Sequence, residues 1–228
     1  MTFSTTDEKA AIERAITPNG ELQLSRMEAE GETHFELIMN GVFLMASYNA
    51  PNCRVLTDAV MSGADQRGHM DLVIGGLGMG FVLRRALEYS NVRTVCVVER
   101  ESKIVEWNRL YLGNNDILDD SGTELVVGDF HDYVHGNPRS YHGIAMDIDN
   151  GPDWIVGQEK RRAYSLSMLQ FLRSRLRPGG ILAILGHAEH GNYERALEQV
   201  FEEVTTHHAE DRYPSGKPLS CIVYEATS

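Results

Sequence analysis

Four glycines stand where a strand is predicted to turn into a helix, and no other part of this chain is better suited to holding a small ligand. They are Gly75, Gly76, Gly78 and Gly80, and they follow the strand-like run 71–74. A turn without Cβ atoms can adopt positive φ and let a ligand lie against its backbone, while the N–H groups that open the next helix attract anions or hydroxyls. The pattern predicts a nucleotide-binding turn.

The spacing of these glycines separates two classes of cofactor. A dinucleotide fingerprint needs its third glycine at the sixth position counted from Gly76, and that position is Phe81. The observed spacing, Gly76-x-Gly78-x-Gly80, is tighter and is typical of proteins that bind the adenosine end of S-adenosylmethionine. It disfavours a nicotinamide oxidoreductase. For the glycines alone, an ordinary tight strand-to-helix connection stays open as the alternative.

Three carboxylates follow the next three predicted strands. Glu99, Asp129 and Asp147 each stand where an apolar, strand-like run ends. In open parallel sheets ligands bind outside the carboxyl ends of the strands, near the switch in strand order. We therefore expect the three acids to share one edge of the sheet with the glycine turn.

Each acid has a chemical role that fits its place. Glu99 is positioned to accept both ribose hydroxyls, because a carboxylate has two oxygens for a bidentate diol contact. Asp129 could accept the exocyclic amine of adenine, with Phe130 or Ile104 covering the ring. Asp147 could hold a substrate ammonium or accept a proton from an attacking amine. For each acid, a turn or helix-capping role is the structural alternative.

The elements that must position these residues begin with a different pattern. Residues 1–17 predict a short N-terminal helix or arm. Residues 20–47 show period-two alternation and predict a small antiparallel unit, with turns at 30–32 and at Asn40-Gly41. A short helix is expected within 54–62.

From residue 71 onward, predicted strands alternate with predicted helices. This order implies a parallel sheet with helices on its faces. Later helices are expected at about 164–176 and 192–204, the turn 177–180 leads into a fifth strand, and the chain closes with a hairpin. The fold class is α/β: a Rossmann-like, mostly parallel sheet with helices on both faces, plus a small N-terminal β-hairpin unit. The predicted domains are residues 1–69, the arm and β unit, and residues 70–228, the nucleoside-binding catalytic domain.

The charge balance bears on the class of partner. The chain carries 33 acidic and 21 basic residues, and its formal net charge is −12. Nucleic acid is disfavoured, because its phosphates would be repelled and Lys/Arg clustering is limited to 160–162. A cationic small substrate is more compatible with this balance.

Apolar spans, cysteines and histidines bear on the compartment and on metals. The sequence has no long apolar span and no basic, apolar leader, so we expect a soluble, cytoplasmic protein that does not enter a membrane. Cys53, Cys96 and Cys221 are scattered, and we expect buried thiols. The histidines show no ligand spacing with cysteines or acids, so no metal site is expected.

These residues resemble the spermidine synthase-like aminopropyltransferases, which share the class I methyltransferase fold. The resemblance covers about residues 35–185. The segment 72–80 is similar to the family's nucleotide loop, and 97–99 is similar to the strand end that carries its ribose acid. The segment 127–129 resembles its adenine contact, and Asp147 falls where its catalytic aspartate stands.

Three positions depart from the family pattern. Its glycine loop carries, at the fourth of six positions, an aspartate that grips the aminopropyl nitrogen of decarboxylated S-adenosylmethionine, and here that position is Gly78. Its aspartate motif has a second acid where this chain has Asn150, with Asp149 one residue earlier. The segment 55–59 replaces its Tyr-His-Glu-like signature. A smaller or different acceptor, or intact S-adenosylmethionine as donor, would tolerate these changes.

The leading interpretation is a spermidine synthase-like transferase. It would move an aminopropyl or related alkyl group to a small amine from an S-adenosyl sulfonium co-substrate, either S-adenosylmethionine or its decarboxylated form. Asp147 would be the catalytic residue, with Tyr164 or Asp149 as a helper. The alternatives are a small-molecule methyltransferase that uses S-adenosylmethionine and a non-catalytic nucleoside-binding homologue. A homodimer is implied by the resemblance alone.

Overall fold

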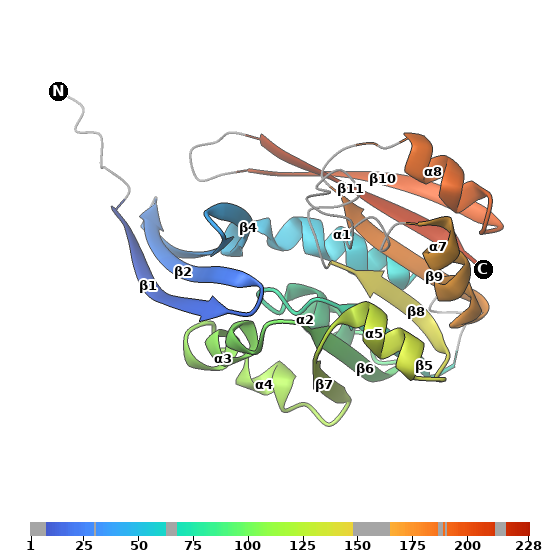
Figure 1. Ribbon diagram of the computed structural model, residues 1–228, viewed down its shortest axis with the longest axis horizontal. Coiled ribbons are helices and arrows are strands. Elements are labelled where there is room, and N and C mark those ends of the chain that lie inside the picture. The colour runs from blue at the N-terminus through green and yellow to red at the C-terminus, as the bar shows by residue number, and fades with distance from the viewer. Residues whose placement is uncertain are drawn as a thin grey trace.

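A computed structural model shows two sheets and a set of helices (Figure 1). It describes residues 8–29, 31–62, 68–147, 165–186, 189, 191–212 and 218–228. One sheet has four strands and the other has seven. Among the described residues, no helix is long and apolar enough to span a bilayer.

The N-terminal strands form an antiparallel sheet in the order β1-β2-β3-β4. They are β1 Glu8–Thr17, β2 Gly20–Ala29, β3 Glu32–Met39 and β4 Val42–Ala46. The predicted helix or arm at residues 1–17 is wrong for residues 8–17, which form β1 and pair with β2 along their length. Cross-strand pairing overrides the helix-like composition of this segment, because helix propensity is only a weak preference.

The predicted turns of this unit are confirmed. Asn40 and Gly41 link β3 to β4, and both have positive φ, 51° and 76°. Two successive residues with positive φ are what a tight hairpin needs, since that turn matches the twist of its strands. Gly31, with φ 82°, stands between β2 and β3. With β1, the antiparallel unit has one more strand than the sequence indicates.

The large sheet has the order β10-β11-β9-β8-β5-β6-β7. Its strands are β5 Met70–Gly75, β6 Val92–Glu99, β7 Thr123–Val127, β8 Tyr141–Met146, β9 Leu176–Gly186, β10 Glu203–Arg212 and β11 Pro218–Thr227. Strands β5 to β9 pair in parallel, whereas β11 pairs antiparallel with β9 and with β10. The chain crosses from β5 to β6 on one side and returns through β8 on the other, so the strand order switches at β5.

Helices cover both faces of this sheet (Figure 1). They are α1 Ala50–Val60, α2 Phe81–Leu87, α3 Ser102–Leu110, α4 Asn115–Leu118, α5 Phe130–Gly136, α7 Leu166–Ser174 and α8 Gly191–Glu198. A 3-10 turn, η1 Ser47–Asn49, precedes α1. The predicted fold class is confirmed.

Strand β5 shows how the core is divided between the two faces. All six of its residues are buried. Leu72 and Ile74 pack in the cluster that holds α1 to α4, and Val73 packs in the cluster that holds α5, α7 and α8. Side chains of a strand alternate between faces, so an apolar run without polar alternation is a strand buried on both sides.

Two local predictions need correction, and two helices are not predicted. The helix expected at 192–204 ends at Glu198, because residues from Glu203 onward pair with β11 as β10. The turn expected at 177–180 lies inside β9, where Gly179 has φ 68°. Helices α4 and α5 are not indicated by the sequence patterns. The domain boundary at residue 69 stays a proposal.

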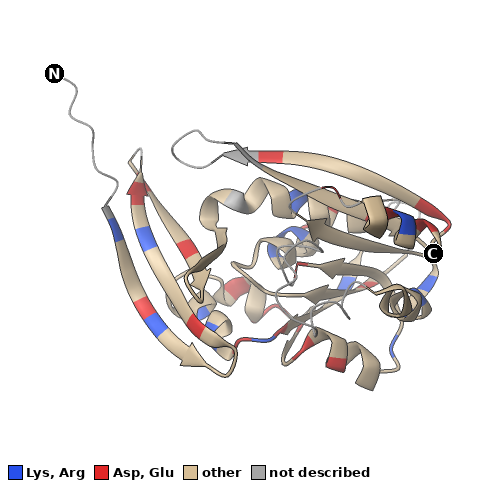
Figure 2. Cartoon of the chain, turned by 45° about the horizontal axis from the view of Figure 1, so that its top comes forward, with Lys and Arg blue, Asp and Glu red and all other residues tan. Residues whose placement is uncertain are grey.

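The hairpin of β1 and β2 in the four-stranded sheet lies beside helix α3 (Figure 1). Lys103 forms an ion pair with Glu13 at 2.8 Å, and the Tyr111 hydroxyl donates to the same carboxylate at 3.0 Å. These contacts place the antiparallel unit beside the helix that follows β6. Acidic and basic residues are interleaved along β1 and β2 in Figure 2, so this unit presents no single basic face in that view.

Candidate functional site

The carboxyl edge of the large sheet gathers the predicted residues. Gly75 pairs with Val98 of β6 on one side and with Met146 of β8 on the other. The Asp147 N–H donates to the Gly75 carbonyl at 2.9 Å. Glu99 is the last residue of β6, which neighbours β5. The register therefore places the glycine turn between the two acids, at the switch in strand order.

The glycine turn needs its glycines at two positions. Gly78 has φ 52°, and a Cβ there would collide with Met45 Sδ of β4. Gly80 is the N-cap of α2 with φ 81°, and a Cβ there would lie 2.8 Å from Asn114 Nδ2. Residues with a side chain avoid this region of φ, so both positions favour glycine on conformation and on space. The antiparallel unit thus reaches the turn through Met45.

Glu99 is built into this turn. Its carboxylate accepts the Leu77 N–H and the Glu101 N–H, each at 2.8 Å, and its side chain is buried. Burial raises the pKa of Glu99 above its usual value, and the hydrogen bonds from Glu101 and Leu77 offset only part of that rise. The Gly78 N–H also lowers the pKa of Glu99 by a hydrogen bond, so three backbone N–H groups leave one of the roughly four lone-pair sites of the carboxylate open. Its predicted contact with ribose stays a prediction.

Asp147 is partly exposed and has no cation beside it among the described residues. The surrounding protein desolvates the Asp147 carboxylate, and this desolvation, followed by the charge of Glu99, raises its pKa to about 6. Two carboxylates that flank the same turn disfavour each other's charge. A cation bound between them would relieve that repulsion.

Asp129 shows the alternative role that its position allows. Its carboxylate caps helix α5, accepting the His131 N–H at 2.9 Å and the Asp132 N–H at 3.1 Å. Phe130 is 4% exposed and packs in the core cluster with α7 and α8. Little of its ring is therefore open to a ligand. The adenine contacts of Asp129 and Phe130 stay predictions.

Part of the predicted site falls outside the description. Tyr164, Asp149 and Asn150 lie among residues 148–164, which the structure does not describe. Cys53, Cys96 and Cys221 are buried, as the sequence predicts. The carboxyl edge as described thus consists of the glycine turn, Glu99, Asp129 and Asp147.

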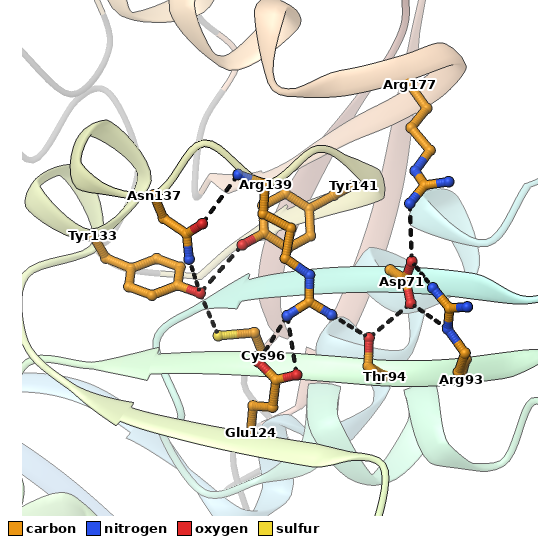
Figure 3. Close-up of polar contacts among 10 residues, drawn as sticks. All are labelled: Asp71, Arg93, Thr94, Cys96, Glu124, Tyr133, Asn137, Arg139, Tyr141 and Arg177. Atoms are coloured by element: carbon orange, nitrogen blue, oxygen red, sulfur yellow. Dashed lines mark hydrogen bonds and ion pairs between the residues drawn. The ribbon is translucent and has the colours of Figure 1, made fainter.

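A second polar cluster lies at the opposite, amino edge of the sheet (Figure 3). The Asp71 side chain is buried at the start of β5 and accepts hydrogen bonds from Arg93, Thr94 and Arg177. Burial acts to raise its pKa, but the hydrogen bonds from Arg93 and Thr94 outweigh it, and the pKa of Asp71 is lowered. Arg139 donates to Thr94 at 2.8 Å and joins the cluster.

Sequence reasoning missed this cluster and the polar residues behind the glycine turn. Asp71 is a charged residue at the head of an apolar strand, and Asn108 is an amide on the buried face of α3. A polar residue inside an apolar pattern signals a buried hydrogen-bond partner. The partners themselves are distant in sequence, since Arg177 is 106 residues from Asp71.

Comparisons with known proteins agree with this arrangement. Residues 56–215 match the family model described as the spermine/spermidine synthase domain. Polyamine aminopropyltransferase 2 of Pseudomonas aeruginosa is 32% identical over 151 residues, 60% of this chain and 41% of that protein. Polyamine aminopropyltransferase 2 of Hyperthermus butylicus is 33% identical over 111 residues, 48% of this chain and 35% of that protein. The chain therefore spans less than half the length of either relative.

Solved structures show the same fold. Spermidine synthase from Thermotoga maritima aligns with a TM-score of 0.72 and 17% identity, covering 95% of this chain and 72% of that one. A spermidine synthase in complex with the transition-state analogue AdoDATO aligns with a TM-score of 0.70, the same identity and the same coverage. At this identity the likeness concerns the fold.

Proposed function

Because the chain belongs to the spermine/spermidine synthase domain family, we propose that it transfers an aminopropyl group from decarboxylated S-adenosylmethionine to a small amine. The names of its relatives, polyamine aminopropyltransferases, support this activity and a polyamine as the acceptor or product. The observation that carries the proposal is the pair Glu99 and Asp147. They are two acids with raised pKa values beside a glycine turn, and neither forms an ion pair with a cationic side chain among the described residues.

The residues of the carboxyl edge fit such a donor. The turn at Gly78 and Gly80 lets the nucleoside lie against the backbone, and the Glu99 carboxylate keeps one acceptor site for a ribose hydroxyl. The donor is a sulfonium and its acceptor is an amine, so both partners bring positive charge or the capacity for it. An edge with uncompensated carboxylates attracts both.

The chemistry is displacement at the carbon attached to sulfur. The amine nitrogen forms a bond to that carbon while the carbon–sulfur bond breaks, and the electron pair leaves with sulfur as a neutral thioether, methylthioadenosine. The proton released by the nitrogen passes to Asp147 and then to solvent. A carboxylate with a pKa of about 6 is ionised at neutral pH and can accept that proton. Alignment of donor carbon, nucleophile and leaving sulfur supplies much of the rate.

Methyl transfer from intact S-adenosylmethionine is the second candidate, and one observation favours it. The turn has Gly78 where the resembling family has an acid, and Met45 fills the space that a side chain there would need. This part of the site therefore offers no carboxylate to the amino group of a decarboxylated donor. The alkyl group that moves thus depends on how the donor tail is held.

A turnover assay separates these candidates. The full chain is incubated with each donor and a panel of small amines and diamines, and the products are identified by mass spectrometry. The proposal predicts methylthioadenosine and an acceptor heavier by one aminopropyl group. S-adenosylhomocysteine with a methylated acceptor would favour the second candidate, and neither product with any amine would contradict both.

A further inference from the structure

Two buried asparagines stand behind the glycine turn. Asn108 of α3 is fully buried, and its Nδ2 donates to the carbonyls of Gly78 and Ile104, both at 2.8 Å. Asn114, just before α4, is 5% exposed. Its Nδ2 donates to the carbonyl of Met79 at 2.9 Å and to Asn108 Oδ1 at 2.7 Å. The two amides therefore hold two successive carbonyls of the turn.

Arg84 fixes the orientation of both side-chain amides in this network. Arg84 of α2 donates to Asn114 Oδ1 at 3.0 Å and forms a two-point ion pair with Asp116. A guanidinium can only donate, so the oxygen of Asn114 must face Arg84 and its nitrogen must face the turn. That nitrogen donates to Asn108 Oδ1, which leaves the Asn108 nitrogen for the Gly78 carbonyl. Neither amide can flip without losing a hydrogen bond.

Holding these carbonyls also sets the N–H groups of the turn. In a trans peptide the C=O and the N–H point in opposite directions. The Gly78 carbonyl points toward α3, so the N–H of Met79 points away from α3. Leu77 donates its N–H to Glu99, and Gly80 donates to the Leu77 carbonyl at 2.8 Å. Asn108 thus decides how the peptide at the tip of the turn faces an incoming ligand.

We propose that Asn108 is a positioning residue for nucleoside binding, acting through the Gly78 peptide. The inference rests on the proposed function, because it assumes that the nucleoside lies against this turn. Aspartate at 108 has the same shape but lacks both N–H donors. The carbonyls of Gly78 and Ile104 would each lose the hydrogen bond from the Asn108 side chain, and a carboxylate would face them. The turn would then leave the conformation that fits the ligand.

The test is a calorimetric titration of the full chain with methylthioadenosine. Asn108→Asp and Asn108→Leu are each expected to weaken binding about 10- to 100-fold, the cost of leaving buried polar groups unpaired. The matched control is Asn115→Asp. Asn115 is an exposed amide of α4 that bonds only with Arg109 among the described contacts, so affinity should stay within about twofold.

Two further readings separate positioning from general loss of stability. Leu172→Ala, in the core cluster on the other face, should destabilise the fold and leave affinity unchanged. In steady-state kinetics the Asn108 variants should raise the KM for the donor far more than they lower kcat. The amide NMR signals of Met79 and Gly80 should shift in the free Asn108 variants.

The outcomes are distinct. If a folded Asn108 variant binds methylthioadenosine as the unaltered chain does, the positioning role is overturned while the proposed function stands. If the unaltered chain itself binds neither methylthioadenosine nor either donor, the proposed function fails and the inference fails with it.

Discussion

The two edges of the large sheet use carboxylates in opposite ways. At the amino edge Asp71 is buried beside Arg93 and Arg177, and hydrogen bonds from Arg93 and Thr94 outweigh burial and lower its pKa (Figure 3). At the carboxyl edge Glu99 and Asp147 have raised pKa values, and among the described residues neither forms an ion pair with an arginine or a lysine. Removing one partner of a paired, buried acid destabilises the fold, whereas an acid whose charge no cation balances attracts a positive ligand. The comparison assigns structure to one edge and chemistry to the other.

Replacing Asp147 should have the largest effect on activity. Asp147→Asn keeps the shape of the side chain and removes its ability to accept a proton, so kcat should fall by roughly two to four orders of magnitude. Initial rates at saturating donor and amine measure this. Normal turnover by Asp147→Asn would break the comparison, because the carboxyl edge would then have no catalytic acid–base group.

Replacing Asp71 should affect stability and not binding. Asp71→Asn removes the charge that accepts hydrogen bonds from three side chains, and the free energy of unfolding should fall by about 1.5–3 kcal/mol, the range for hydrogen bonds to a charged group. Urea denaturation measures that loss. Methylthioadenosine affinity, extrapolated to the fully folded protein, should stay within about twofold. A large loss of affinity would mean that the two edges are not separate.

Adding an acid at position 78 tests why the glycine turn at the carboxyl edge carries no acidic side chain there. Gly78→Asp places a side chain at φ 52° and against Met45 Sδ, so it should destabilise the fold by about 1–2 kcal/mol. Met45→Ala should recover the part that comes from the collision and not the part that comes from φ. Thermal unfolding of the two single variants and the double variant measures this coupling.

The pH dependence of stability should have opposite signs at the two edges. The folded pKa of Asp71 is lowered, so its contribution is present above pH 3.8 and is lost as the pH falls further. The folded pKa of Asp147 is raised to about 6, so the unfolded chain binds fewer protons between pH 3.8 and 6, and stability falls as the pH rises through that window. Asp147→Asn should therefore gain stability relative to the unaltered chain as the pH rises from 4 to 7. A difference that is flat with pH would contradict the raised pKa.

Local patterns were enough for the centre of the fold. The run before the glycine turn is a strand buried on both faces, and acids at strand ends follow from the rule that parallel strands share one carboxyl edge. The segment 8–17 was misjudged because its pairing with β2, and not its composition, makes it a strand. Periodicity does not indicate the end of α8 at Glu198, because the residues that follow form β10 by pairing with a distant strand, as Glu203 does with Thr227 of β11.

The support around the site was beyond the reach of the sequence. Asn108 and Asn114 read as ordinary helix and loop residues, and only the folded chain brings their amides to the carbonyls of the turn. Met45 is an apolar strand residue, and its contact with Gly78 joins two sheets. Such contacts depend on packing between distant elements, which periodicity does not encode.

The most direct test of the account is one set of calorimetric titrations. Decarboxylated S-adenosylmethionine, S-adenosylmethionine and methylthioadenosine are titrated into the unaltered chain and into Asp147→Asn, at pH 7.5. We expect all three to bind, and we expect the decarboxylated sulfonium to bind most tightly and to lose most affinity in Asp147→Asn, because its positive charge meets that carboxylate. Absence of binding by all three ligands would contradict the assignment of this edge as a nucleoside site.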